Sequence, residues 1–160
     1  MTLQYKEGCL IQALKSGEVQ AIGHQANCFH TMNSGVAKAI RLAFPGAYFA
    51  DTSLTVKGDR SKLGTFSIYQ AYPHELSGEP GLIYNLYGQY NYGYDARGYT
   101  DYAALESALM GMSDDLLTGD SLTRVGFPKI GAGLGGGDWE IIEGIIIRAF
   151  DGFEVTVYLK

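Results

Sequence analysis

The sequence predicts a layered α/β fold with a largely parallel or mixed central sheet. Short runs rich in β-branched and aromatic residues alternate with segments of helical periodicity through most of the 160 residues. We find no internal repeat and no Pro-rich linker, and the composition of the two halves is similar. A chain of this length buries roughly two thirds of its unfolded surface as one domain, so residues 1–160 are expected to form a single domain.

The elements follow in order from their residue patterns. Val19–Gly23 is expected to be a short buried strand, and Val36–Phe44 repeats apolar residues at helical spacing until Pro45 and Gly46 end the helix. The remaining expected elements are strands at 65–72 and 82–87 joined by a turn at 77–81, a helix at about 101–117 capped by Thr100 or Asp101, a strand at 123–130, a helix at 139–150 and a final strand at 154–159.

Charge and cysteine content exclude several classes of function. The formal net charge is −5, with no basic run, so nucleic acid is not an expected partner. The longest apolar run, at 141–150, contains charged residues and glycine, and the N-terminus lacks the basic start and apolar stretch of a signal peptide. We therefore expect a cytoplasmic protein without membrane contact. With three His and no C-x-x-C, we expect no metal and no cofactor.

The segment PKIGAGLGGGDW, at 128–139, contains a G-x-G-x-x-G between an expected strand and an expected helix. Backbone N–H groups of such a loop, with the helix N-terminus, suit a phosphate. A Rossmann site needs an acidic residue at the end of the next strand, where this chain has Leu159 and Lys160. We therefore reject the Rossmann interpretation, and a glycine-rich surface loop without a ligand stays an alternative.

A second loop decides between these interpretations. Residues 23–37, GHQANCFHTMNSGVA, again join an expected strand to a helix start through small polar residues. Two such loops at the ends of parallel strands form a cleft in which backbone amides hold a diphosphate from both sides. Such a cleft suits ADP-ribose.

Five segments, in this order along the chain, resemble the macro domain family. Within it they resemble the branch that contains terminal ADP-ribose protein glycohydrolases and ADP-ribose 1''-phosphate phosphatases. The segments are YKEGCL near the start, HQANCFHTMNSGVA, IYNLYGQ, PKIGAGLGGGDWEII and TVYL near the end. The resemblance covers nearly the whole chain and implies a three-layer α/β/α fold with a mixed central sheet of about six strands.

The resemblance also implies ligand contacts. Cys9 and Leu10 would lie near adenine, with Tyr158 or Leu159 closing that end, and Asn27 would bond the distal ribose. The other implied contacts are Ser34, Gly35 and Val36 around one phosphate, and Gly131, Gly133, Leu134, Gly135 and Gly136 around the other phosphate and the ribose. The implied partner is ADP-ribose, a 1''-substituted ADP-ribose or an ADP-ribosylated protein.

Several positions depart from the family pattern. Cys9 stands where many members carry an Asp that binds the adenine amino group, and Asn33 replaces a usual Gly. The nearest branch uses a Lys on the strand matching IYNLYGQ and an Asp in the glycine loop. These places fall at Gly88 or Gln89, and at Gly135. Hydrolysis through a lysine adduct is therefore not expected.

Three residues are candidates for catalysis. His24 orients a water, protonates a leaving phosphate, or is a structural histidine. Asn27 either binds two ribose hydroxyls or closes an Asx turn. Asp138, immediately before Trp139, either acts as a general base or caps a helix, and we favour the cap. We interpret His30 as an exposed loop residue.

The Tyr-rich segment at 87–102 is expected to form an aromatic lip over the cleft or a protein contact surface.

The predicted function is metal-independent hydrolysis at the distal ribose, foremost as an ADP-ribose 1''-phosphate phosphatase. The alternatives are a non-catalytic reader of ADP-ribose or ADP-ribosylated protein, and a protein ADP-ribosyl hydrolase with a non-lysine mechanism.

Overall fold

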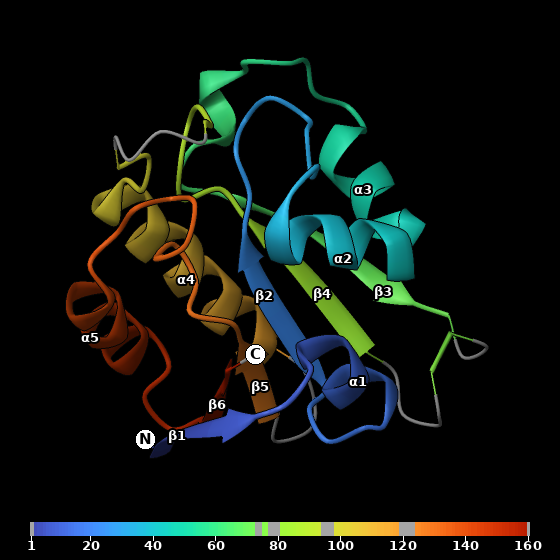
Figure 1. Ribbon diagram of the computed structural model, residues 1–160, viewed down its shortest axis with the longest axis vertical. Helices are drawn as coiled ribbons and strands as arrows, with labels where there is room; N and C mark the ends of the chain where they lie inside the picture. Colours follow the sequence, from blue (N-terminus) through green and yellow to red (C-terminus); the bar gives the residue numbers. More distant parts are fainter. Residues whose placement is uncertain (1, 73–74, 77–80, 94–97, 119–123, 160) are drawn as a thin grey trace.

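The computed structural model describes residues 2–72, 75–76, 81–93, 98–118 and 124–159 (Figure 1). Its central sheet runs in the order β1-β6-β5-β2-β4-β3. The strands are β1 (Thr2–Glu7), β2 (Ala21–Gln25), β3 (Phe66–Ala71), β4 (Gly81–Leu86), β5 (Arg124–Phe127) and β6 (Glu154–Leu159). Neighbouring strands are parallel except β3, which pairs antiparallel with β4. The prediction of a mixed sheet of about six strands is confirmed.

Helices cover both faces of this sheet (Figure 1). Those on one face are α1 (Leu10–Lys15), α2 (Gly35–Ala43) and α3 (Pro45–Thr52), and those on the other are α4 (Tyr102–Leu117) and α5 (Trp139–Ala149). A separate apolar core fills each interface. One contains Ile22, Ile83 and Phe44, and the other contains Tyr84 and Phe127. The predicted α/β/α arrangement in three layers is confirmed.

The alternation of side chains along β2 explains why this strand is buried on both faces. Ile22 packs against the core that contains α1, α2 and α3. Gly23 points the other way, because a Cβ there would lie 2.8 Å from Phe127 Cε1 and 2.9 Å from Leu86 Cδ1. A central parallel strand in an α/β fold is buried in this manner, and its C-terminal end opens at one edge of the sheet.

Two elements in the first half of the chain differ in detail from the sequence predictions. The strand predicted at 19–23 lies at β2, two residues later. The helix predicted at 36–44 ends before Pro45, as expected, but Pro45 also begins α3, because proline's fixed φ suits a first helical position. Helix α1, which has six residues, and helix α3, which has eight, were not predicted from periodicity.

The other predicted elements are confirmed within a few residues. The strand predicted at 123–130 is shorter, ending at Phe127, because Pro128 has no N–H for a ladder. Asp101 caps α4 by accepting a hydrogen bond from Ala104 N at 3.0 Å. Most of the predicted turn at 77–81, and residues 94–97 of the Tyr-rich segment, lie outside the described residues. Among the described helices, none combines the length and the apolar character that crossing a membrane requires.

Candidate functional site

A pocket of about 370 Å³ lies between the loop after β2 and the loop after β5. Because these parallel strands end at the same edge of the sheet, their loops face each other across the pocket, as the sequence predicted. Its lining consists of residues 24–27, 31–37, 128–131 and 133–135, with Asp51, Gln89, Tyr92 and Gly93. The contribution of Tyr92 and Gly93 places part of the predicted aromatic lip at the pocket.

Asn27 lies in the loop after β2 and lines the pocket. Its side-chain oxygen accepts a hydrogen bond from Phe29 N at 2.8 Å, and its amide nitrogen donates to Thr31 Oγ1 at 2.8 Å. The structure therefore contains the Asx turn that the sequence left open as an alternative. That turn fixes the Asn27 side chain at the pocket, where one more hydrogen bond to its oxygen is available.

Ser34, Gly35 and Val36 also line the pocket, where α2 begins. The first N–H groups of a helix lack partners within the helix and attract anions. Gly35 has φ +57°, a backbone conformation that glycine adopts without strain. This wall thus presents backbone donors beside the Asn27 amide.

Arg41 anchors the same loop from α2. Its Nη1 donates to Thr31 O at 3.0 Å and to Asn33 Oδ1 at 2.8 Å, while its guanidinium lies 3.8 Å from the Tyr48 ring centroid. Asn33 therefore has a structural partner in addition to its place in the pocket lining. The interpretation of His30 as exposed was wrong, because it is half-buried and its Nε2 lies 2.8 Å from Thr55 Oγ1.

Backbone hydrogen bonds hold the glycine loop on the opposite wall. Thr100 Oγ1 donates to Gly131 O at 2.7 Å, and the N–H groups of Tyr99 and Thr100 both donate to Gly135 O, at 2.6 and 2.9 Å. Gln25 Nε2 in turn donates to Thr100 Oγ1 at 2.9 Å and to Gln89 Oε1 at 2.7 Å. The Tyr-rich segment thus fixes the glycine loop through its final residues.

This packing bears on two positions at which the chain departs from the branch that the sequence resembles. A Cβ at Gly135 would lie 2.5 Å from Thr100 Oγ1 and 2.8 Å from Gly131 O. A Cβ at Gly88 would lie 2.3 Å from Gln25 Oε1. The backbone oxygen of Gly131 leaves no room for a side chain at Gly135. At Gly88 the nearest atom is the far end of the Gln25 side chain, and Gln89 carries a side chain that lines the pocket.

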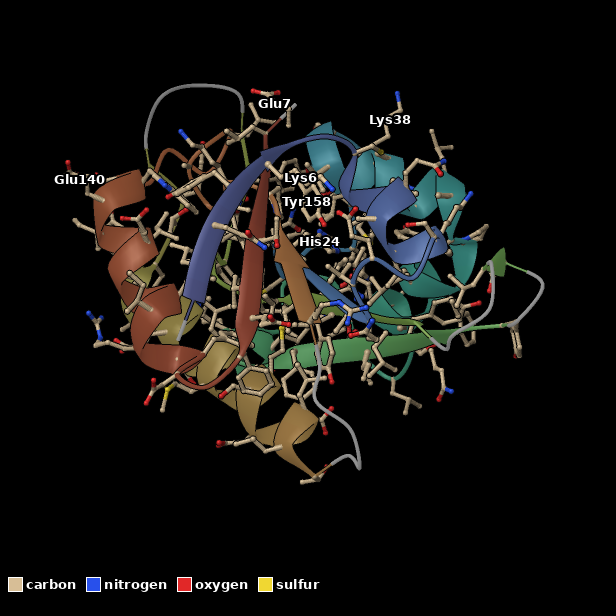
Figure 2. All side chains as sticks on the ribbon, turned by 90° about the horizontal axis from the view of Figure 1, so that it is seen from below. Lys6, Glu7, His24, Lys38, Glu140 and Tyr158 are labelled. Atoms are coloured by element: carbon tan, nitrogen blue, oxygen red, sulfur yellow. The ribbon has the colours of Figure 1, made fainter. Side chains whose placement is uncertain are left out.

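His24 lies at the interior end of the pocket, in contrast to the peripheral Lys38 and Glu140 (Figure 2). Its Nε2 is 2.6 Å from Asn85 Oδ1, its neighbour in the β2–β4 register. Burial lowers the pKa of His24, while the Asn85 contact and the charge of Asp51 act in the opposite direction. The ring is therefore neutral near pH 7.

Asp51 lines the same end of the pocket, and sequence reasoning missed it. Lys62 Nζ lies 3.1 Å from Asp51 Oδ1, and their side chains are 5% and 1% exposed. No local motif marks either residue. Asp51 belongs to the unpredicted helix α3, and Lys62 lies in a short 3₁₀ helix at Arg60–Lys62.

Five of the predicted site residues do not line the pocket. Asp138 caps α5 by accepting a hydrogen bond from Glu140 N at 3.0 Å, and Gly136 closes a turn with Gly133 at 3.0 Å. Cys9 precedes α1, where Leu10 and Tyr158 both pack over Gly126. Tyr158 also hydrogen-bonds Glu18. The residues expected near adenine therefore form a neighbouring cluster that is separate from the pocket lining.

Within the described parts of the chain, no group of three or more His, Cys, Asp or Glu side chains is placed to hold a metal ion. Cys9 and Cys28 are both free thiols. Burial raises the pKa of the Cys28 thiol. A buried thiol of this kind is a poor nucleophile, because the thiolate is the reactive form.

Residues 24–146 match the sequence profile of the family described as the macro domain. The chain is 33% identical over 157 residues to an uncharacterized 17.5 kDa protein in the tk-vs intergenic region of Enterobacteria phage T4, covering 98% of this chain and 96% of that protein. Its fold matches the macrodomain of Thermus aquaticus DarG with a TM-score of 0.76 and 24% identity, covering 99% of each chain. It also matches Thermosipho africanus DarTG, whose structure is a complex with ADP-ribose, with a TM-score of 0.76 and 18% identity over 100% of this chain and 42% of that one. The chain belongs to the macro domain family.

Proposed function

We propose that the pocket binds ADP-ribose and that the protein hydrolyses a substituent on the distal ribose, foremost a 1''-phosphate. The observation that carries this proposal is the pocket itself, where an amide side chain and the first turn of a helix face a glycine loop. Thermosipho africanus DarTG, which shares the fold, forms a complex with ADP-ribose. Membership of the macro domain family supports the same ligand for this chain.

The two walls have different roles in this proposal. Ser34, Gly35 and Val36 bind one phosphate through backbone N–H groups, and the start of α2 contributes up to about 1 kcal/mol of electrostatic attraction. Residues 131–135 cover the second phosphate and the distal ribose. Asn27 bonds a ribose hydroxyl and orients the anomeric carbon toward the floor of the pocket.

Positioning and electrostatic stabilisation supply the rate, because the pocket offers no activated protein nucleophile. The pocket-lining residues contain no Cys and no Lys except Lys129, whose Nζ lies 5.9 Å from the Trp139 ring centroid. Water is therefore the proposed attacking group, and no metal takes part. Among the members of the macro domain family, this proposal places the protein in the branch of distal-ribose hydrolases.

A second candidate function is a reader that binds ADP-ribose or ADP-ribosylated protein without hydrolysis. It is favoured by one specific observation, namely that Gly135 leaves no room for the Asp of the branch that the sequence resembles. A protein ADP-ribosyl hydrolase with another residue set differs from the phosphatase only in its leaving group.

The test measures phosphate release from ADP-ribose 1''-phosphate in the presence of a chelator, together with ADP-ribose binding in the same samples. Wild type is compared with Asn27→Ala and with Asn27→Asp, which keeps the oxygen that closes the turn. Asn91→Ala is the matched control, because Asn91 also bonds a backbone N–H, of Tyr92, yet does not line the pocket.

We expect release by wild type and by Asn91→Ala, and at least about a tenfold loss in both Asn27 variants. Tight ADP-ribose binding without phosphate release would favour the reader or a different leaving group. Absence of ADP-ribose binding would contradict the proposal as a whole.

A further inference from the structure

Thr100 fixes two carbonyl groups of the glycine loop from outside the pocket. Its Oγ1 donates to Gly131 O at 2.7 Å, and its N–H donates to Gly135 O at 2.9 Å. Thr100 is absent from the pocket lining, whereas Gly131 and Gly135 both belong to it. Any effect of the Thr100 hydroxyl on a ligand must therefore pass through the glycine loop.

The middle of the glycine loop presents N–H groups that the loop itself does not use. The N–H groups on either side donate locally, from Ala132 to Lys129 O at 3.2 Å and from Gly136 to Gly133 O at 3.0 Å. Among the described residues, the N–H groups at 133–135 have no backbone carbonyl as a partner. Successive N–H groups of this kind form a concave site for an anion. A loop held in this form suits a phosphate before the phosphate arrives.

Gln25, the last residue of β2, determines what the Thr100 hydroxyl can do. Because Gly131 O only accepts, Thr100 Oγ1 must donate to it, and Thr100 Oγ1 then accepts from Gln25 Nε2 at 2.9 Å. The same amide nitrogen donates to Gln89 Oε1 at 2.7 Å. The Gln89 amide is oriented in turn, since its Nε2 donates to Asn91 O at 2.8 Å. Both neighbours of Gln25 therefore require a donor, and its amide can face them in one way only.

The Gln25 amide thus connects two segments that border the pocket. Through Thr100 it holds the glycine loop, and through Gln89 it holds the start of the Tyr-rich segment. Both hydrogens of its nitrogen are used in these bonds, and its oxygen is closed to solvent. Although Gln25 belongs to the pocket lining, its amide offers a ligand neither a donor nor an accessible acceptor.

We propose that Gln25 and Thr100 are positioning residues that preorganise the glycine loop for the diphosphate of ADP-ribose. This inference rests on the proposed binding of ADP-ribose. A loop that already holds its N–H groups in place loses less conformational entropy when the anion binds. Because the diphosphate is held in the same way before and during the reaction, the two residues raise the affinity for ADP-ribose and leave the rate of bond cleavage unchanged.

Substitutions that keep the shape of the side chain isolate these hydrogen bonds. Thr100→Val removes the hydroxyl and keeps the branched side chain, while Thr100→Ser keeps the hydroxyl. Gln25→Met keeps the length of the side chain, removes both donors and adds no negative charge beside the phosphates. Thr118→Val is the matched control, because the Thr118 hydroxyl also donates to a backbone carbonyl, Asp115 O, at 2.7 Å and lies outside the pocket lining.

The readouts are the affinity for ADP-ribose, kcat and KM for phosphate release, and the amide chemical shifts of the ligand-free protein. We expect Thr100→Val to bind ADP-ribose about tenfold more weakly and to raise KM, with kcat within about twofold of wild type. Its amide shifts should change at 131–137. Thr100→Ser and Thr118→Val should bind ADP-ribose within about twofold of wild type. If Thr100→Val does not fold, Gln25→Met carries the test.

A double variant tests whether Gln25 acts through Thr100. We expect Gln25→Met to weaken ADP-ribose binding by at least about tenfold, since it releases Gln89 as well as Thr100. When both changes are combined, the loss of affinity should be smaller than the product of the two single losses. A loss equal to that product would mean that the two residues act independently, which would contradict the proposed path.

Other results would overturn the inference. Unchanged ADP-ribose affinity in Thr100→Val, with tight binding by wild type, would remove the positioning role while leaving the proposed function intact. Equal losses in Thr100→Val and Thr100→Ser would assign the effect to packing and not to the hydroxyl. A loss confined to kcat would contradict preorganisation for binding. A wild type that binds no ADP-ribose would contradict the proposed function, and this inference with it.

Discussion

The two walls of the pocket differ in whether side chains or backbone groups form most of their polar contacts. The wall after β2 relies on side chains, with Asn27 and His24 backed by the buried pair of Asp51 and Lys62. The wall after β5 relies on backbone, because Thr100 and neighbouring N–H groups bond the carbonyls of Gly131 and Gly135. The first wall therefore carries most of the polar side chains at the pocket, while the second supplies mainly shape and backbone donors, with Lys129 as its charged side chain.

This difference bears on one departure from the family branch that the sequence resembles. The branch places an Asp in the glycine loop, but here Thr100 occupies the volume that a side chain at Gly135 would need. On the opposite wall, His24 Nδ1 and Asp51 Oδ2 are buried polar atoms without a hydrogen-bond partner among the described residues.

The buried ion pair of Asp51 and Lys62 lies behind the wall after β2, and its loss should lower stability the most. Lys62→Met leaves the Asp51 carboxylate buried and unpaired, so we expect a loss of about 3–5 kcal/mol in the free energy of unfolding. The control is Lys6→Met, which removes an exposed 2.6 Å ion pair with Glu18 and should cost less than about 1 kcal/mol. Chemical denaturation measures both variants. Equal small losses would show that the buried pair does not support this wall.

Close packing at Gly135 holds the glycine loop on the wall after β5. Gly135→Ala places a methyl group against Thr100 Oγ1 and Gly131 O, so the loop must shift. We expect a cost of about 1–3 kcal/mol in stability. Gly133→Ala is the matched control in the same loop, since nothing lies within 4 Å of the Cβ that alanine would add there. If the two variants unfold at the same denaturant concentration, the loop does not depend on the Thr100 contact.

The burial of His24 makes the stability of the protein depend on pH. Burial depresses the pKa of His24 in the folded state, so below pH 6.5 the unfolded chain binds a proton that the folded chain excludes. This contribution to stability is complete above about pH 6.5 and falls with decreasing pH, by at most about 1.4 kcal/mol per pH unit. Unfolding curves of wild type and His24→Gln between pH 5 and 8 measure it. The variant should show the shallower slope, and identical slopes would contradict a buried neutral His24.

A smaller effect concerns the end of the glycine loop. Asp138→Ala removes the cap of α5 and should lower stability by about 1 kcal/mol, whereas Asp138→Asn keeps the capping oxygen. Both variants should release phosphate at the wild-type rate. Loss of phosphate release in Asp138→Asn, with stability preserved, would instead assign Asp138 as a general base on the wall after β5.

The smallest expected effect concerns Asn33, which replaces a usual glycine. Asn33→Gly removes one partly exposed hydrogen bond with Arg41, worth about 1 kcal/mol or less. We expect phosphate release to change more than ADP-ribose affinity, because the residue lies in the loop that frames Asn27. Steady-state rates and titrations of the same sample compare the two quantities, and equal losses in both would contradict this expectation.

Much of the fold was predictable because its signals are local. The strands at β3, β4 and β6 and the helices α4 and α5 have clear periodicity, and the two strand-to-helix loops identified the pocket. Helices α1 and α3 were missed because elements of six and eight residues present too few turns for a periodic pattern. The start of helix α3 at Pro45 was missed because proline usually signals the end of a helix, although it also fits the first turn of one.

The site was less predictable, because its deepest part depends on tertiary contacts. His24 was identified by resemblance, but its partner Asn85 becomes a neighbour only through strand register. Asp51 and Lys62 lie in segments without a motif, and only the folded chain brings them under the pocket. Leu10 and Tyr158 pack over Gly126 beside the pocket, and their contact with adenine stays a prediction.

The most direct test of the central claim is the location of ADP-ribose on the protein. Titration of ADP-ribose into the ¹⁵N-labelled protein, followed by amide chemical shifts, reports each backbone N–H separately. If ADP-ribose binds in the pocket, we expect the largest shifts at 33–36 and at 131–135, on both walls of the pocket. Shifts confined to one wall, or centred on the apolar groove around Phe49 and Tyr72 between α3 and β3, would contradict it.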